Sequence, residues 1–244
     1  MEESKKISIC HLYPDLLNLY GDRGNILIMK KRLEWRGFDV EVTGNTCAQP
    51  LDWEAHDIYF IGGGQDFEQE VLLSDLEKGK SEAIRAAVEG GKVFLAICGG
   101  YQLLGKRYET WDGKKLDLIG AINVTTRGMR DRMVGDFAFK TPTGLTVVAF
   151  ENHSGRTYLG DGVEPLGEVL AGNGNNGEDG TEGVRYKNVW CSYGHGPLLS
   201  KNPALCDEIL RMAVLQKYAD FAFEALDDEL ENAAGSYMSG RIVK

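Results

Sequence analysis

The chain lacks long hydrophobic runs, and it lacks any excess of basic charge. No stretch of about 18 consecutive apolar residues occurs, and no signal-type apolar segment follows the charged residues 1–6. These absences argue against a membrane-spanning or secreted protein and favour a cytoplasmic one. The net charge of −10 argues against nucleic acid or anionic lipid as the main partner, because either requires a basic face. The acidic charge is compatible with a basic protein as partner.

Cysteine is scarce and unpaired in the sequence. The five cysteines are scattered over 244 residues and include no C-x-x-C pair, which favours neither a disulfide framework nor a zinc knuckle. The phosphate-binding pattern G-x-x-x-x-G-K-[ST] does not occur either. We therefore expect no metal and no ATP in this chain, and reduced thiols that fit a cytoplasmic enzyme.

Apolar strand patterns and helical patterns alternate along the first half of the chain. Strands are predicted over 7–13, 39–43, 57–61 and 93–97, and helices over 26–35 and 81–89. Repeated β-α-β units predict an α/β fold with a mainly parallel sheet flanked by helices. Because ligands bind beyond the carboxyl ends of parallel strands, the Gly62–Gly64 loop and Cys98 are expected to face one site.

The second half of the chain has shorter β-type segments, which predict added antiparallel strands over 121–125, 135–140, 146–150 and 189–193. The glycine-, asparagine- and acid-rich stretch 160–183 is expected to be a mobile loop that buries little. Helices are expected over 203–213 and 218–230. We interpret residues 1–225 as one domain and residues 226–244 as a C-terminal extension, partly disordered.

The most informative segment is Val93–Gly105, where an apolar run stops at Cys98 and two glycines follow. A strand-to-helix turn of this kind strains its central residue, needs neighbours without a Cβ and exposes the free N–H groups of the next helix. A cysteine there loses its proton more easily and becomes a nucleophile. The alternative is a buried cysteine that only packs at the end of a core strand.

The catalytic base is sought among four histidines. His195 follows the predicted strand 189–193 and is flanked by glycines that would let the imidazole project into a cleft, so it is the first choice. His153 follows another strand and is interpreted as a structural histidine. His11 and His56 are interpreted as structural or exposed.

Several motifs in this order resemble the class I glutamine amidotransferases, in the branch that includes cobyric acid synthase. They are the Gly62–Asp66 loop, the cysteine turn with Gln102, and the late strand that leads to His195. Within that branch, three further segments are similar to the small glutaminase subunits of lipid II isoglutaminyl synthases: residues 17–25, 150–157 and 195–199.

The resemblance implies a flavodoxin-like glutaminase that takes L-glutamine and passes ammonia to a MurT-like Mur ligase. That partner would use ATP and Mg²⁺ to amidate the α-carboxyl of the D-glutamate in lipid II, so no cofactor is expected in this chain. Cys98 would attack the glutamine amide, and His195 would protonate the departing ammonia. Two other interpretations stay open: a stand-alone thiol hydrolase of γ-glutamyl bonds, and a non-catalytic scaffold of the ligase.

Other residues complete the predicted site. The backbone N–H groups of Gly63, Gly64 and Gly99 are expected to hold the oxyanion, because glycine lets the backbone approach closely. Gln102 is expected to steady the site or contact substrate, with a helix-surface amide as the alternative. The resemblance implies a substrate arginine near Arg132, whose guanidinium can grip the glutamine α-carboxylate. Arg127 and Arg130 are equally well explained as surface arginines.

One position departs from the family pattern. Most class I enzymes have a glutamate two residues after the histidine, whereas Pro197 stands here. Three alternatives follow: Glu151 orients His195, an acidic residue of the partner orients it, or the Cys98–His195 pair works without a carboxylate. We favour the partner residue, because glutaminase activity would then stay low until the complex forms and glutamine would not be wasted. The segment Asp22–Asn25 is expected at the same rim, where it shapes the ammonia exit or the partner contact, or forms only a turn and cap.

Overall fold

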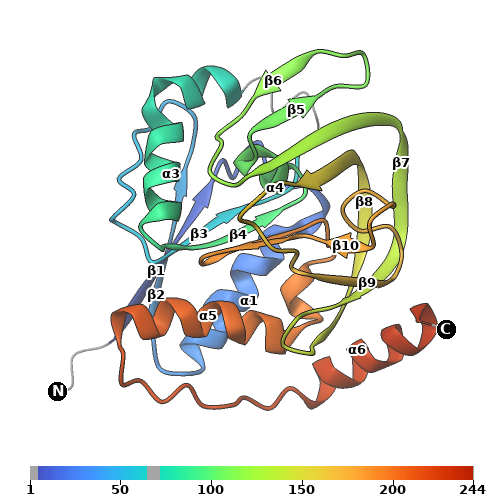
Figure 1. Ribbon diagram of the computed structural model, residues 1–244. Helices are drawn as coiled ribbons and strands as arrows, with labels where there is room; N and C mark the ends of the chain where they lie inside the picture. The colour runs from blue at the N-terminus through green and yellow to red at the C-terminus, as the bar shows by residue number, and fades with distance from the viewer. Residues whose placement is uncertain (1–4, 65–71, 244) are drawn as a thin grey trace.

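The computed structural model describes residues 5–64 and 72–243, which form two sheets with helices packed against the first (Figure 1). The first sheet has the order β11-β12-β4-β3-β1-β2, and only β11 is antiparallel to its neighbour. Its strands are β1 (Lys6–Leu12), β2 (Asp39–Asn45), β3 (Ile58–Ile61), β4 (Val93–Ile97), β11 (Val184–Tyr186) and β12 (Val189–Ser192). The helices are α1 (Arg23–Glu34), α3 (Ser81–Glu89), α4 (Gly99–Leu104), α5 (Pro203–Lys217) and α6 (Glu229–Ile242).

The centre of the first sheet is apolar throughout. Every residue of β3 and β4 is buried, as parallel strands covered on both faces require. Figure 1 shows α1 and α5 below this sheet and α3 above it. The predicted mainly parallel sheet with flanking helices is confirmed, and the carboxyl ends of β1, β3, β4 and β12 meet at one edge.

The second sheet is built on a long antiparallel hairpin, β7 (Val124–Lys140) with β8 (Thr146–Leu159). The two short strands predicted over 121–125 and 135–140 are joined in β7, and the register shifts between Gly128 and Met133. The remaining strands are β5 (Arg107–Glu109), β6 (Lys115–Asp117), β9 (Gly167–Ala171) and β10 (Thr181–Glu182). The predicted antiparallel addition is confirmed for 121–125, 135–140 and 146–150, in longer strands than expected. It is wrong for 189–193, because β12 belongs to the first sheet and runs parallel to β4.

The prediction that residues 160–183 bury little is wrong. The stretch contains β9 and β10, and Asn175 and Asn176 are buried. The Asn175 side chain donates to the carbonyl of Gly183 at 3.0 Å and accepts from its N–H at 2.9 Å, as a neighbouring strand would. Asparagine side chains thus replace backbone pairing, which lets a glycine-rich segment pack.

The predicted helix over 218–230 is also wrong. Residues 219–228, which we call the strap, are irregular, and α6 begins only at Glu229, within the extension that we expected to be partly disordered. The extended strap brings Phe221 to 4.7 Å from Phe38, between ring centroids, and Phe223 to 4.0 Å from the Arg36 guanidinium. These tertiary contacts replace the local hydrogen bonds of a helix.

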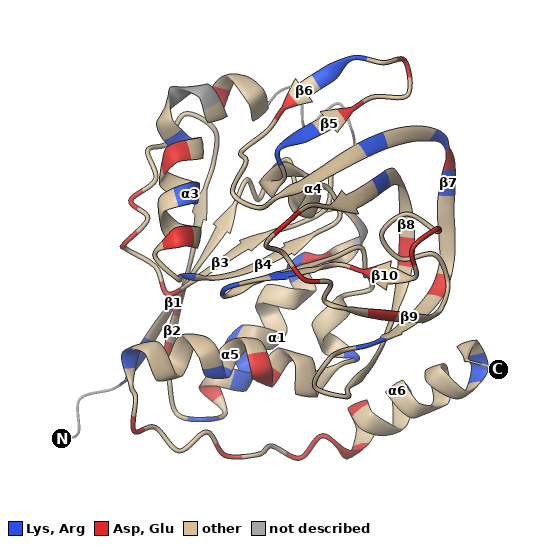
Figure 2. Cartoon of the chain, viewed as in Figure 1, with Lys and Arg blue, Asp and Glu red and all other residues tan. Residues whose placement is uncertain are grey.

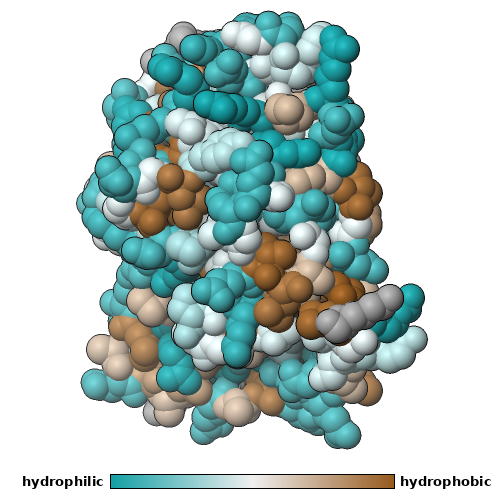
Figure 3. Space-filling model, turned by 45° about the vertical axis from the view of Figure 1, so that its right-hand side comes forward, coloured by the Kyte–Doolittle hydropathy of each residue, from teal (hydrophilic) through white to brown (hydrophobic). Residues whose placement is uncertain are grey.

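The strap and the start of α6 are acidic, as Figure 2 shows. Figure 3 shows apolar residues on the side of the molecule where α6 lies against the β7–β8 hairpin. The exposed large apolar side chains of these elements include Met129, Val134 and Leu230.

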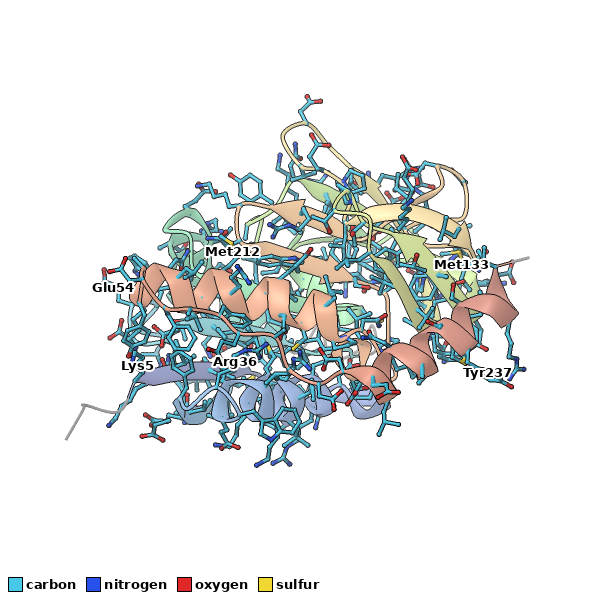
Figure 4. All side chains as sticks on the ribbon, turned by 90° about the horizontal axis from the view of Figure 1, so that it is seen from below. Lys5, Arg36, Glu54, Met133, Met212 and Tyr237 are labelled. Atoms are coloured by element: carbon cyan, nitrogen blue, oxygen red, sulfur yellow. The ribbon has the colours of Figure 1, made fainter. Side chains whose placement is uncertain are left out.

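Arg32 ties three elements together. It is 1% exposed and binds Asp207 of α5 through Nε and Nη2, both at 2.7 Å. Nη1 and Nη2 bind the strap residue Asp228 at 2.5 and 2.8 Å. Figure 4 shows Arg36, which also binds Asp207, where α1, α5 and the strap meet. A bidentate guanidinium suits such a junction because its donors are rigidly spaced.

Replacing Arg32 will therefore destabilise the fold. We expect Arg32→Met to lower the free energy of unfolding by about 3 kcal/mol, because Asp228 loses its buried counter-ion and Asp207 keeps only Arg36. Urea unfolding followed by circular dichroism measures the change. Lys31→Met is the matched control, since Lys31 is mostly exposed on the same helix and should matter little; equal stabilities of the two variants would contradict the prediction.

Candidate active site

Cys98 lies between β4 and α4 with φ 50° and ψ −105°, the strained geometry that the sequence predicted. Its N–H donates to the carbonyl of Ser192 at 2.9 Å. A Cβ on Gly99 would come within 2.7 Å of the Gly64 nitrogen, and one on Gly100 within 2.6 Å of the Ile61 carbonyl oxygen. The glycines are therefore required because the β3 loop passes directly over the turn.

His195 is placed against Cys98 by the end of β12. Its backbone pairs with Phe150 of β8, with its N–H donating at 2.8 Å, and the residue is 1% exposed. The imidazole lies beside the Cys98 side chain, which helps to raise the pKa of His195. The structure thus brings together the two residues predicted as nucleophile and base, from two adjacent parallel strands.

A carboxylate completes the arrangement. Asp22, fully buried at the start of α1, places Oδ1 3.0 Å from His195 Nδ1 and accepts the Gly63 N–H on Oδ2 at 2.8 Å. A Cβ on Gly63 would lie 2.9 Å from Asp22 Oδ2, 3.0 Å from His195 Cε1 and 3.5 Å from Cys98 Cβ. Four loops therefore converge on one point with no spare volume.

The carboxylate controls the charge of the imidazole. Burial alone lowers the pKa of His195, but the hydrogen bonds to Asp22 and Cys98 outweigh it and raise the pKa to about 10. At neutral pH the imidazole is therefore protonated and can donate a proton.

Sequence reasoning missed this role of Asp22. Glu151 does not orient His195: it accepts hydrogen bonds from the backbone N–H groups of Asn173 and Gly174, at 2.9 and 3.0 Å. The favoured hypothesis of a partner residue is also corrected, because His195 Nδ1 already faces a carboxylate of its own chain. The available signal was position: Asp22 follows the first strand, whose carboxyl end lies at the same edge of the sheet as those of β4 and β12.

The three predicted oxyanion glycines differ in the structure. The N–H of Gly63 is bound to Asp22, so that prediction is wrong for Gly63. Gly64 and Gly99 run side by side next to Cys98, and their role stays a prediction. The final two residues of the family loop, Gln65 and Asp66, lie outside the described residues.

The two predicted substrate residues also differ. Gln102 is buried, 5% exposed, rather than a helix-surface amide, and its Nε2 donates to the Tyr193 hydroxyl at 3.1 Å. Arg132 is exposed in the irregular part of β7, where Nε and Nη2 donate to Oδ1 and the carbonyl of Asn152 at 2.8 Å. Their contact with substrate stays a prediction.

Arg127 and Arg130, for which a surface position was an equal alternative, lie over the aromatic rings of Tyr158 and Trp111. Both arginines are exposed strand residues of β7. These ring contacts are surface packing.

The remaining histidines have structural surroundings. His153 stacks on Tyr193 with ring centroids 3.6 Å apart, and its Nδ1 lies 2.8 Å from the Gly155 carbonyl. Burial lowers the pKa of His153, so this ring stays neutral. His11 packs edge-on against Phe60, and His56 bonds to Thr43.

In the part of the chain that the structure describes, no group of three His, Cys, Asp or Glu side chains could hold a metal ion. None of the described helices combines the length and the apolar composition of a membrane span.

Removing the Asp22 charge will lower the pKa of His195. In Asp22→Asn we expect the titration midpoint of His195 to fall by at least about one pH unit, because about 1.4 kcal/mol of preference for the imidazolium is lost per unit. NMR titration of the imidazole measures the midpoint. Glu151→Gln is the control, since Glu151 acts on His153 and should leave the His195 midpoint unchanged.

The same shift predicts how stability depends on pH. The pKa of His195 is raised above its ordinary 6.5, so its stabilising contribution is complete below about pH 6.5 and is lost as the pH rises through about 10. The difference in melting temperature between the native protein and Asp22→Asn should shrink over that range. A difference that grows with pH would contradict the assignment.

Comparison with known proteins supports the predicted family. The CobB/CobQ-like glutamine amidotransferase domain matches residues 8–203. The GatD subunit of the glutamine-hydrolysing lipid II isoglutaminyl synthase from Streptococcus pneumoniae is 42% identical over 92% of this chain and 87% of its own length. The Staphylococcus aureus GatD subunit is 40% identical over 97% of this chain and 96% of its own.

More distant similarities are consistent with the fold. The cobyric acid synthase of Pelotomaculum thermopropionicum is 30% identical over 57% of this chain but only 29% of its own length. Among solved structures, PurLQS and a glutamine amidotransferase, both from Thermotoga maritima, each align with a TM-score of 0.53. PurLQS is 19% identical, and its alignment covers 86% of this chain and 98% of its own. The glutamine amidotransferase is 13% identical, and its alignment covers 96% of this chain and 94% of its own.

Proposed function

The chain belongs to the CobB/CobQ-like glutamine amidotransferase family, among the GatD subunits of lipid II isoglutaminyl synthase, and we propose that it hydrolyses L-glutamine through a thioester on Cys98. The observation that carries this proposal is the contact of Cys98, at the strained turn, with a His195 that Asp22 holds in place. A protonated imidazole favours the thiolate form of a neighbouring cysteine, which is the nucleophile, and can itself act as the general acid.

The first half of the reaction forms the thioester. The Cys98 thiolate attacks the carbonyl carbon of the glutamine side-chain amide, and the carbonyl oxygen becomes an oxyanion. His195 then donates its proton to the amide nitrogen, the C–N bond breaks and ammonia leaves. Asp22 stabilises the imidazolium and fixes its orientation, which keeps the proton directed at the leaving group.

The second half restores the enzyme. The imidazole, now neutral, takes a proton from water, and the hydroxide attacks the thioester carbon. The C–S bond breaks, glutamate leaves, and the thiolate–imidazolium pair is restored. The balance is one glutamine and one water consumed for one glutamate and one ammonia.

Backbone and side-chain groups near Cys98 would bind the rest of the substrate. The N–H groups of Gly64 and Gly99 would stabilise the oxyanion, because fixed donors in a dry site need no reorganisation. We assign to Gln102 the role of steadying the turn through its hydrogen bond to Tyr193. We assign Arg132 to the binding of the glutamine α-carboxylate, for which Arg132 must exchange its hydrogen bonds to Asn152 for bonds to the substrate.

The ammonia would pass to a second subunit. Both GatD relatives are named as subunits of a glutamine-hydrolysing lipid II isoglutaminyl synthase. We propose a MurT-like Mur ligase as the partner, which binds ATP and Mg²⁺ and amidates the D-glutamate α-carboxyl of lipid II. The free cysteines of this chain fit a cytoplasmic location for that reaction.

Glutamine hydrolysis by the purified chain, with and without the ligase, tests the proposal. We expect the complex to release ammonia and glutamate in equal amounts, and Cys98→Ala and His195→Ala each to lower kcat by at least about 1,000-fold, because the nucleophile and the acid act as one unit. Coupled assays for ammonia and glutamate measure both products.

Cys47→Ala is the matched control, since this partly buried cysteine lies outside the site and should keep full activity. Unimpaired lipid II amidation from glutamine by a complex carrying Cys98→Ala would favour the scaffold instead. Hydrolysis of γ-glutamyl peptides in preference to glutamine would favour the stand-alone hydrolase.

A further inference from the structure

Glu182 is a buried carboxyl to which neither the sequence motifs nor the reaction steps assign a role. It ends β10, at the point where the chain crosses from the second sheet into β11 of the first, and its exposure is 0%. Its hydrogen-bond partners among the described residues are neutral groups, the Ser192 hydroxyl and the Tyr193 backbone amide.

One oxygen of Glu182 holds the end of β12. Oε1 accepts from Ser192 Oγ at 2.7 Å and from the Tyr193 N–H at 2.8 Å. Ser192 Oγ in turn accepts the Gly194 N–H at 2.8 Å. The carboxyl oxygen thereby fixes Ser192 and Tyr193 directly, and Gly194 through the Ser192 hydroxyl.

These three residues position both reacting side chains. The Ser192 carbonyl accepts the N–H of Cys98 at 2.9 Å, which fixes the strained turn from the β12 side. Gly194 is joined directly to His195, whose side chain contacts Cys98. A displacement of residues 192–194 would therefore move the nucleophile and the acid relative to each other.

We propose that Glu182 is a positioning residue, which sets the Cys98–His195 geometry by holding the Ser192–Gly194 turn. The inference rests on the proposed glutaminase function and goes beyond it, because Glu182 touches neither substrate nor the reacting atoms. Positioning of this kind matters because misplacement by about 1 Å can cost about 100-fold in rate.

The backbone that carries Glu182 is itself fixed. Asn175 binds both backbone groups of the next residue, Gly183, and accepts a hydrogen bond from the Tyr101 hydroxyl of α4 at 3.1 Å. A Cβ on Gly183 would come within 2.1 Å of the Cys191 carbonyl oxygen. Glu182 is thus a rigid anchor rather than a mobile side chain.

The polar character of Glu182 is costly to the fold. Burial raises its pKa to about 7, although the hydrogen bonds from Ser192 and Tyr193 act in the opposite direction. Its second oxygen, Oε2, is buried and makes no hydrogen bond to the described residues. The Oε1 contacts need an acceptor and not a charge, so a glutamine at this position can replace the glutamate.

Three variants of the complex with the ligase test the proposal. We expect Glu182→Leu to lower kcat for glutamine by about 10- to 100-fold, with KM changed by no more than about twofold because the substrate contacts remain. Glu182→Gln should recover kcat to within about threefold of the native value. Ser192→Ala, which removes one link while β12 keeps its backbone, should also lower kcat with KM unchanged.

Alkylation of Cys98 by iodoacetamide in the full chain gives a second readout that needs no partner. It should be slowed in Glu182→Leu and Ser192→Ala and restored in Glu182→Gln. Asp75→Asn is the matched control: this buried carboxylate binds the Ala48 N–H, the Tyr13 hydroxyl and Lys80 Nζ instead, and its loss should leave kcat and alkylation unchanged.

A folded Glu182→Leu with native kcat and alkylation would overturn the inference. If Glu182→Leu does not fold, native kcat in Ser192→Ala would overturn it. Full hydrolysis by Cys98→Ala would instead overturn the proposed function, so the two failures are distinguishable.

Discussion

The carboxylate of Asp22 is the interaction on which the site depends, because its two oxygens serve two loops at once. One oxygen fixes the His195 imidazole at 3.0 Å, and the other binds the Gly63 N–H at 2.8 Å. Asp22 follows β1, Gly63 follows β3 and His195 follows β12, so a single side chain joins three strand ends of the parallel sheet. The burial of its charge is offset by these two donors, one of which is a protonated imidazole.

Around this carboxylate the backbone is packed without room for further side-chain atoms. Gly63, Gly99 and Gly100 each face an atom closer than a Cβ can approach. The left-handed backbone of Cys98 persists because the Ser192 carbonyl holds its N–H on one side and the β3 loop closes over it on the other. Strain at the nucleophile is therefore maintained by the surrounding packing, and that packing requires glycine.

The sequence predicted what local patterns can encode. Buried apolar runs predicted the central strands, and Cys98 before two glycines predicted the strained turn. Asp22 was missed as the carboxylate that orients His195, because the two residues are 173 positions apart and only the sheet topology brings them together. The errors at 160–183 and 218–230 have the same origin: Asn175 and the strap are held by tertiary contacts that no local propensity reveals.

Pro197 packs against the start of α1, directly after the residue, Asp22, that supplies the carboxylate in place of a glutamate two residues after His195. A Cβ on Gly24 would come within 2.2 Å of the Pro197 ring, so the first turn of α1 packs directly on this proline. That contact fixes the helix start, and the helix start carries Asp22. A glutamate in place of Pro197 would remove the surface on which α1 rests, and would bring a second carboxylate toward an imidazole that already has one. Pro197 thus supports the start of α1, and Asp22 at that helix start orients His195.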